Sequence, residues 1–146
     1  MLCVALVLHG CIYAQQLPLP AASDKSSKPK LFANLPDSFE VDKQELHNIF
    51  SASINENITA QLSNAFVITG NVVAKNQHTP GSISVNIRVS NYSNALFNLT
   101  LRLQADNSSA IQGRLLHPKY GDVLLLFKEQ DKYFLKKESQ ALLMPD

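Results

Sequence analysis

Cysteine is nearly absent from this sequence of 146 residues. The two that occur, Cys3 and Cys11, both lie within the first dozen positions. Once those positions are removed, the chain can form neither an internal disulfide nor a thiolate metal site. A small exported domain without disulfides is more typical of a bacterial periplasm or culture medium than of animal secretions.

An excess of charge of either sign is absent as well. Thirteen Lys and Arg residues balance twelve Asp and Glu residues, which gives a net charge of +1. This balance provides no general electrostatic attraction to nucleic acid or to an anionic membrane. We therefore expect no nucleic-acid partner.

The local motifs of common enzymes are missing too. The sequence contains no Gly-x-Ser-x-Gly, no His-Glu-x-x-His and no glycine-rich phosphate loop. After the first 14 residues the histidines are His47, His78 and His117, which fall on a predicted helix and in two separate turns. We expect a protein that is not an enzyme, with no cofactor and no metal site.

The amino-terminal residues form a unit of their own. Residues 1–14 are an apolar run that ends in the small residue Ala14, as in the core and cleavage site of a secretory signal peptide. The run is too short for a stable membrane span, and no Lys or Arg precedes it. Two alternatives stay open: a buried terminal element, or a lipid anchor on Cys11, because residues 8–11 resemble a lipobox. Cleavage near Ala14 predicts a secreted or periplasmic protein.

Residues 15–30 contain three prolines, three serines and three lysines and little bulky apolar content. This composition predicts a disordered linker. Apolar content returns at Leu31, so residues 31–146 are expected to form one domain.

Two segments with alternating apolar residues lie at the centre of that domain. In residues 83–89 and 97–103 every second residue is apolar and the intervening ones are mostly polar, which predicts two half-buried strands. The link, residues 90–94, is rich in Ser and Asn and predicts a hairpin turn. Further β-rich segments separated by turns predict an antiparallel meander of about five strands. Gly70, inside the segment 66–74, indicates a bulge or a close backbone approach.

One helix is expected before the strands. Asp42 can cap it, Glu45 can complete a capping box, and Val41 can pack on Leu46. The helix begins near Lys43 and its apolar stripe continues to residues 53–54. Residues 54–63 fit either helix or strand. The fold class predicted is α+β, with this capped helix packed on a curved antiparallel meander.

The polar face of the predicted sheet is the first candidate binding surface. Its candidate residues are Asn86, Arg88, Thr100, Arg102 and Arg114. Hairpins centred on residues 93 and 107 would place the three arginines in different cross-strand rows. The surface is therefore either simply solvated or a site for a polar ligand or partner, and a shift of either turn would change the rows.

The turn at residues 117–122 is a second candidate. His117 and Asp122 flank it and form the nearest thing to an acid–base pair, with Tyr120 between them. Backbone hydrogen bonds to Asp122 explain the same residues equally well. Four Asn-x-Ser/Thr sequons, at Asn57, Asn91, Asn98 and Asn107, would carry glycans only in a glycosylating host.

The outer strands of the meander are a third candidate. We expect residues 66–74 and 133–137 at the two edges, with lysines guarding the second edge. The first edge could accept an extended peptide by strand addition.

Several segments resemble a known group of proteins. Residues 66–70, 84–88, 91–97 and 113–122 together resemble small exported domains of Bacteroidetes-type bacteria, some of which are pro-regions of secreted metalloproteases. The resemblance covers about residues 31–138. A helix followed by a meander is also similar in outline to the cystatin-like fold, although the Gln-x-Val-x-Gly segment of those inhibitors is missing. The sequence departs from the pro-region pattern because no catalytic domain follows in it, which argues against a cis-acting pro-region and leaves a stand-alone descendant as the alternative.

Two functional hypotheses follow. The first is a non-enzymatic exported binding domain for an unknown exported protein or polar ligand. The alternative is a pro-region-like inhibitor of a secreted protease that acts through an edge strand or a turn.

Overall fold

The computed structural model describes residues 28–143. The predicted signal peptide, the possible lipid anchor at Cys11 and most of the predicted linker lie outside this range. The elements in chain order are β1 (Ser38–Val41), α1 (Lys43–Ile49), β2 (Asn57–Ser63), β3 (Phe66–Thr79), β4 (Ser82–Val89), η1 (Ser90–Tyr92), β5 (Ala95–Leu103), β6 (Ser109–Leu116), β7 (Asp122–Glu129), β8 (Lys132–Ser139) and η2 (Gln140–Leu143).

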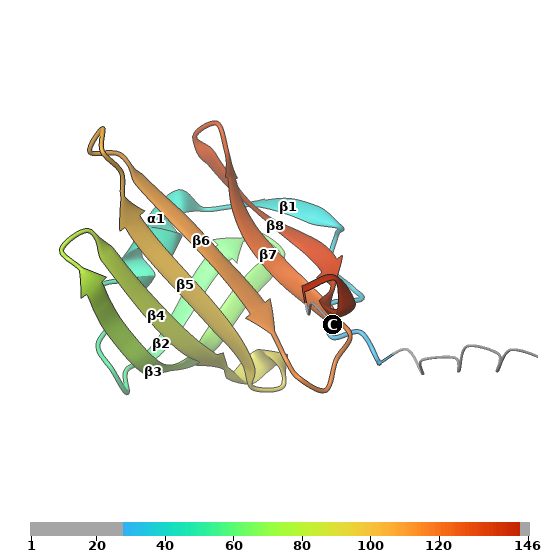
Figure 1. Cartoon of the computed structure of the whole chain (residues 1–146). Coiled ribbons are helices and arrows are strands. Elements are labelled where there is room, and N and C mark those ends of the chain that lie inside the picture. Colours follow the sequence, from blue (N-terminus) through green and yellow to red (C-terminus); the bar gives the residue numbers. More distant parts are fainter. Residues whose placement is uncertain (1–27, 144–146) are drawn as a thin grey trace, which may run out of the picture.

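The eight strands form one antiparallel sheet in the order β1-β8-β7-β6-β5-β4-β3-β2. The sheet curls into a half-barrel, and α1 lies behind it between the two ends (Figure 1). The predicted α+β class with about five strands is therefore wrong, because the fold is mostly β and its one α-helix is short. The elements for which no strand was predicted include β1, which has only four residues, and β2, which lies in the segment left open between helix and strand.

The positions predicted for the edges are also wrong. Strand β3 is paired with β2 and β4, and β8 is paired with β7 and β1, so both lie inside the sheet. The edges are β1 and β2. They approach each other at one point, where the Asp42 N–H donates to the Leu62 carbonyl at 2.7 Å.

The core fills the concave side of the curl. The alternation predicted for β4 and β5 is confirmed: Val85, Ile87, Phe97 and Leu99 are completely buried there. From the opposite side α1 contributes Leu46, which is also fully buried. The helix therefore covers the apolar face of the sheet, as its stripe predicted.

Helix α1 begins as predicted and ends earlier than predicted. The Asp42 side chain accepts the Glu45 N–H at 2.8 Å and caps the first turn. The reciprocal half of the capping box is missing, because the Asp42 N–H is bonded to Leu62 instead. After Ile49 the Lys75 ammonium donates to two carbonyls at the end of the helix, those of Phe50 and Ala52. In the described part of the chain, no helix has the length and apolar character that a bilayer crossing requires.

Candidate functional site

The convex face of β4, β5 and β6 carries the side chains predicted as a binding surface. We call this surface the outer polar face; it comprises Asn86, Arg88, Asn98, Thr100, Arg102, Gln112 and Arg114. They share it because alternate residues of paired strands point to the same side of a sheet. The alternate residues of the same strands point to the concave side and belong to the core. On the convex side these polar side chains avoid that burial.

Two shallow hollows adjoin each other on the outer polar face. One, of about 230 Å³, is lined by Asn98, Thr100, Arg102, Gln112, Gly113, Arg114 and Leu125. The other, of about 570 Å³, is lined by His78, Thr79, Gly81, Ser82, Thr100, Arg102 and Leu103. Thr100 and Arg102 line both hollows. The two hollows therefore adjoin at Thr100 and Arg102 and form one continuous depression, with Arg102 where they meet and Arg114 in the smaller hollow.

The observed strand register differs from the predicted one. Arg114 lies opposite Asn98, which in turn lies opposite Asn86. Arg102 lies opposite Ser82 and Ala110. The centre of each hairpin therefore lies one residue before the predicted one. The three arginines still occupy different cross-strand rows.

The two arginines of the depression stand well apart. Along β5, Arg102 is four residues from Asn98, the partner of Arg114. At about 3.3 Å per residue and about 4.8 Å between strands, their Cα atoms are about 14 Å apart. Such a spacing suits an elongated ligand with two anionic groups better than a single small anion.

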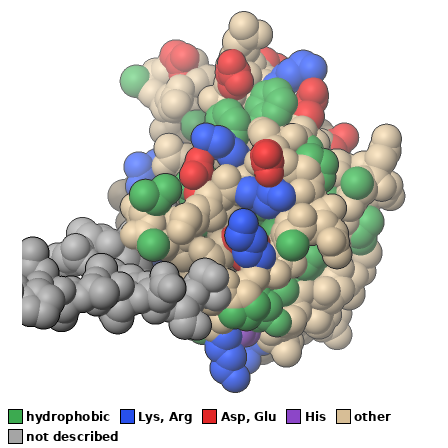
Figure 2. Space-filling model, turned by 90° about the vertical axis from the view of Figure 1, so that its right-hand side faces the viewer, with side chains coloured by type: hydrophobic (Ala, Val, Ile, Leu, Met, Phe, Trp, Pro, Cys, Tyr) green, Lys and Arg blue, Asp and Glu red, His purple; other side chains and the backbone are tan. Residues whose placement is uncertain are grey.

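No carboxylate neutralises these arginines. Within residues 28–143, neither Arg102 nor Arg114 forms a salt bridge, and no Asp or Glu lines either hollow. By contrast, charges of both signs are interspersed on the side formed by β1 and β8 (Figure 2). There Lys132 pairs with Glu40 at 2.8 Å and Lys136 with Glu138 at 2.7 Å. The outer polar face thus differs from the side formed by β1 and β8, where opposite charges pair.

The other residues predicted for this face have different surroundings. The Asn98 amide donates to the Asn86 side chain, so these two asparagines hold each other in place. Arg88 lies opposite Leu96 and Asn71 and lines a separate hollow near the η1 turn. His78, expected in a turn and not on this face, joins it, and its Nε2 is 2.8 Å from the Ser84 hydroxyl. Its place on this face depends on the register irregularity near the end of β3, which periodicity does not reveal.

The turn at residues 117–122 does not bring an acid and a base together. Both oxygens of Asp122 accept backbone N–H groups, at 2.7 Å from Leu31 and 2.8 Å from Phe32. The His117 Nδ1 accepts the Lys119 N–H at 3.1 Å. The Tyr120 ring packs edge-on against the His117 ring, with centroids 5.1 Å apart. This arrangement anchors the segment that leads into the sheet.

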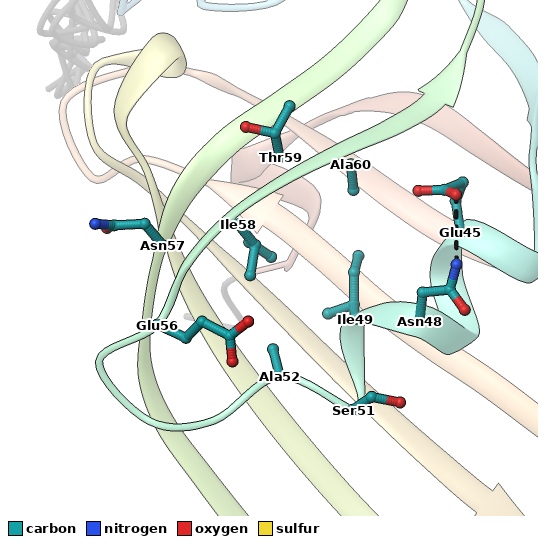
Figure 3. A pocket seen from close by; sticks show the side chains of 10 residues that line it. All are labelled: Glu45, Asn48, Ile49, Ser51, Ala52, Glu56, Asn57, Ile58, Thr59 and Ala60. Atoms are coloured by element: carbon teal, nitrogen blue, oxygen red, sulfur yellow. Dashed lines mark hydrogen bonds between the residues drawn. The ribbon is translucent and has the colours of Figure 1, made fainter.

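A further hollow lies between α1 and β2, where the sequence analysis had placed no site. We call it the α1–β2 hollow (Figure 3). Its volume is about 350 Å³ and it is lined by Glu45, Asn48, Ile49, Ser51, Ala52, Glu56, Asn57, Ile58, Thr59 and Ala60. Residues 54–63 had been compatible with either helix or strand, and the hollow exists because residues 57–63 form strand β2.

Two of the four sequon asparagines, Asn91 and Asn107, shape the turns in which they lie. The Asn91 side chain accepts the Thr69 N–H at 3.0 Å and donates to the Val67 carbonyl at 2.8 Å, which ties η1 to β3. Asn107 has a φ of 62° in the β5–β6 turn, a conformation that asparagine tolerates well. The Asn-rich composition of the turns thus has a local conformational explanation.

The part of the chain that the structure describes contains no group of three His, Cys, Asp or Glu side chains placed to hold a metal ion. Comparisons with protein-family models, curated proteins and solved structures found no match. Any functional conclusion must therefore come from the geometry itself.

Proposed function

We propose that this protein is a non-enzymatic exported binding domain whose outer polar face binds an elongated anionic ligand. One observation carries the proposal: Arg102 and Arg114 line a continuous depression in which no carboxylate and no salt bridge from residues 28–143 neutralises them. A guanidinium presents several N–H donors in a plane and binds phosphate, sulfate or carboxylate groups through paired hydrogen bonds.

The residues between the arginines support the same conclusion. Thr100 and Gln112 lie opposite each other in the row between those of Arg102 and Arg114. Their hydroxyl and amide groups can hydrogen bond to the polar backbone of a ligand that spans both arginines. The proposed ligand is a chain with anionic groups spaced by about 14 Å or less, such as a sulfated oligosaccharide.

Titration calorimetry with a sulfated hexasaccharide tests this proposal. We expect the Arg102→Gln/Arg114→Gln double variant to bind at least about tenfold more weakly, since a charge-assisted hydrogen bond contributes roughly 1.5–3 kcal/mol. The Lys43→Gln/Lys119→Gln double variant is the matched control, because it removes the same charge from elsewhere on the surface. Equal weakening by the two double variants, or no saturable binding to the unaltered protein, would contradict the proposal.

The protease-inhibitor hypothesis requires a different surface. Both edges expected for it are interior strands, and the turn at residues 117–122 anchors the amino-terminal segment. Among residues 28–143, the edges open to pairing with an extended chain are β1, which has four residues, and the longer β2.

A further inference from the structure

Strand β2 has backbone groups that pair with no other strand. It is the last strand of the sheet, and the Val72 N–H donates to the Glu56 carbonyl at 3.0 Å where the β2–β3 pairing begins. Because inward-directed and outward-directed groups alternate along an antiparallel strand, the N–H and C=O of Thr59 point away from β3. No described residue forms a backbone hydrogen bond with them outside the sheet pairing.

The α1–β2 hollow lies directly beside this edge. The side chains of Ile49, Ala52 and Ala60 in it are buried, and Ile58 is half-buried, so they make an apolar floor. Figure 3 shows Glu45 and Glu56 on opposite sides of the hollow, with both carboxylates directed toward the space between them. The hollow thus combines an apolar floor with two acidic groups at its rim.

Both carboxylates accept a hydrogen bond from an uncharged neighbouring group. One oxygen of Glu56 accepts the Ser53 N–H at 2.7 Å. One oxygen of Glu45 accepts from the Asn48 amide at 3.4 Å. Neither residue forms a salt bridge with any part of the described chain. An incoming cation therefore meets two carboxylates that pair with no cationic side chain of residues 28–143.

We propose that the β2 edge binds an extended peptide by strand addition and that the α1–β2 hollow takes up a lysine or arginine side chain of that peptide. Backbone hydrogen bonds to Thr59 would extend the sheet by one strand. The aliphatic stem of the basic side chain would lie on the apolar floor, and its charged end would pair with a carboxylate at the rim, in the field of the other. This site lies apart from the outer polar face and binds ligands of opposite charge.

Fluorescence polarisation with a labelled peptide tests the proposal on the full chain. The probe is the seven-residue sequence Thr-Val-Thr-Lys-Thr-Val-Thr. A second peptide has norleucine in place of the lysine, which retains the aliphatic stem without the charge. A third has N-methyl groups on alternate backbone nitrogens, which prevent strand pairing. We expect saturable binding of the first peptide and about tenfold weaker binding of the other two.

Variants identify the site on the protein. The Glu45→Gln/Glu56→Gln double variant should weaken binding of the lysine peptide about tenfold and leave binding of the norleucine peptide unchanged. The Glu40→Gln/Glu129→Gln double variant removes two charges elsewhere and should have no effect. Circular dichroism checks that both variants are folded. The proposal is overturned if the lysine peptide does not bind at about 1 mM, if norleucine or N-methylation has no effect, or if the two double variants behave alike. The calorimetric test with the anionic ligand is independent of all these outcomes.

Discussion

The Asp122 carboxylate accepts the backbone N–H of Phe32 at 2.8 Å, across 90 positions of the sequence. Its second oxygen accepts the Leu31 N–H at 2.7 Å. Phe32 is only 1% exposed and belongs to the core cluster. One buried carboxylate thus fixes the chain at the point where it enters the half-barrel, and Phe32 follows into the core.

Replacing Asp122 with alanine should lower the free energy of unfolding by roughly 2–4 kcal/mol, because two backbone N–H groups lose a charged acceptor. Urea unfolding followed by circular dichroism measures the change. Asp131→Ala is the control, since this carboxylate is 81% exposed and its removal should change stability little. If both variants lost a similar amount of unfolding free energy, the two backbone hydrogen bonds to Asp122 would not account for the effect.

Part of this fold could be predicted from sequence because the information is local. Alternation in β4 and β5 and the Asp42 cap depend on residues within a few positions of each other, and both are observed. Strand β1 has too few residues for a periodic signal. In strand β2, Ile58, Ala60 and Leu62 alternate with polar residues, but Ile58 and Leu62 also have helical spacing, so the sequence fits either element and pairing with β3 decides between them. For this reason the number of strands, and hence the class of the fold, was predicted wrongly.

In the candidate sites, too, some features could be predicted from local sequence and others depend on tertiary structure. Periodicity correctly placed Arg102 and Arg114 on one face, because residues two apart share a side of a strand. Their neighbours depend on turn geometry: Ser93 and Asn94 both adopt positive φ, and this shifts the register of the β4–β5 hairpin. The α1–β2 hollow depends on the place where a short helix meets the edge of the sheet, which no local pattern encodes.

Gly70 interrupts a strand-forming segment of the sequence, and the reason lies in the neighbouring strand β4. A Cβ atom there would lie 2.9 Å from the Arg88 carbonyl carbon and 3.0 Å from the Val89 Cα, both backbone atoms of the neighbouring strand. The bulges of β3 occur elsewhere, so of the two alternatives a close backbone approach is the correct one.

Replacement of Gly70 by alanine should therefore destabilise the protein by about 1–3 kcal/mol, because backbone atoms of a paired strand cannot move aside cheaply. Gly81→Ala is the matched control. The Cβ of this variant, in the turn between β3 and β4, would lie 3.2 Å from the Cβ of Leu103, which is 56% exposed, and a small shift of the exposed chain relieves this contact. Thermal unfolding should show a clear loss for the first variant and little for the second. Equal midpoints would contradict the steric argument.

Tyr133 is completely buried, and its hydroxyl accepts the Ile111 N–H at 3.1 Å. Tyr133→Phe leaves this buried N–H without its acceptor and should cost about 1–3 kcal/mol of stability. Tyr120→Phe removes a hydroxyl that makes only a 3.5 Å contact with Ser93 at the surface, so its stability should stay close to that of the unaltered protein. Urea unfolding of both variants measures the difference, and a stable Tyr133→Phe would show that water or a shifted backbone satisfies the N–H.

Tyr92 packs against the core, and its burial should make the stability of the protein depend on pH in the alkaline range. Its ring centroid is 5.8 Å from that of Phe32 and 5.2 Å from that of Phe66, and burial raises the pKa of its hydroxyl above the ordinary value of 10.0. Below that value the phenol is neutral in both folded and unfolded chains, so its contribution to stability is fully present. As the pH rises further the unfolded chain ionises first, and stability falls until the folded pKa is passed.

The Tyr92→Phe variant has no phenol to ionise and should lose less stability than the unaltered protein between about pH 9 and about pH 11. Urea unfolding at a series of pH values measures both slopes, and the difference between the slopes cancels the contribution of the other ionising groups. At about pH 7 the two proteins provide the control, because the phenol is neutral in both states there. Parallel slopes across the alkaline range would show that the Tyr92 hydroxyl reaches water as freely in the folded chain as in the unfolded one.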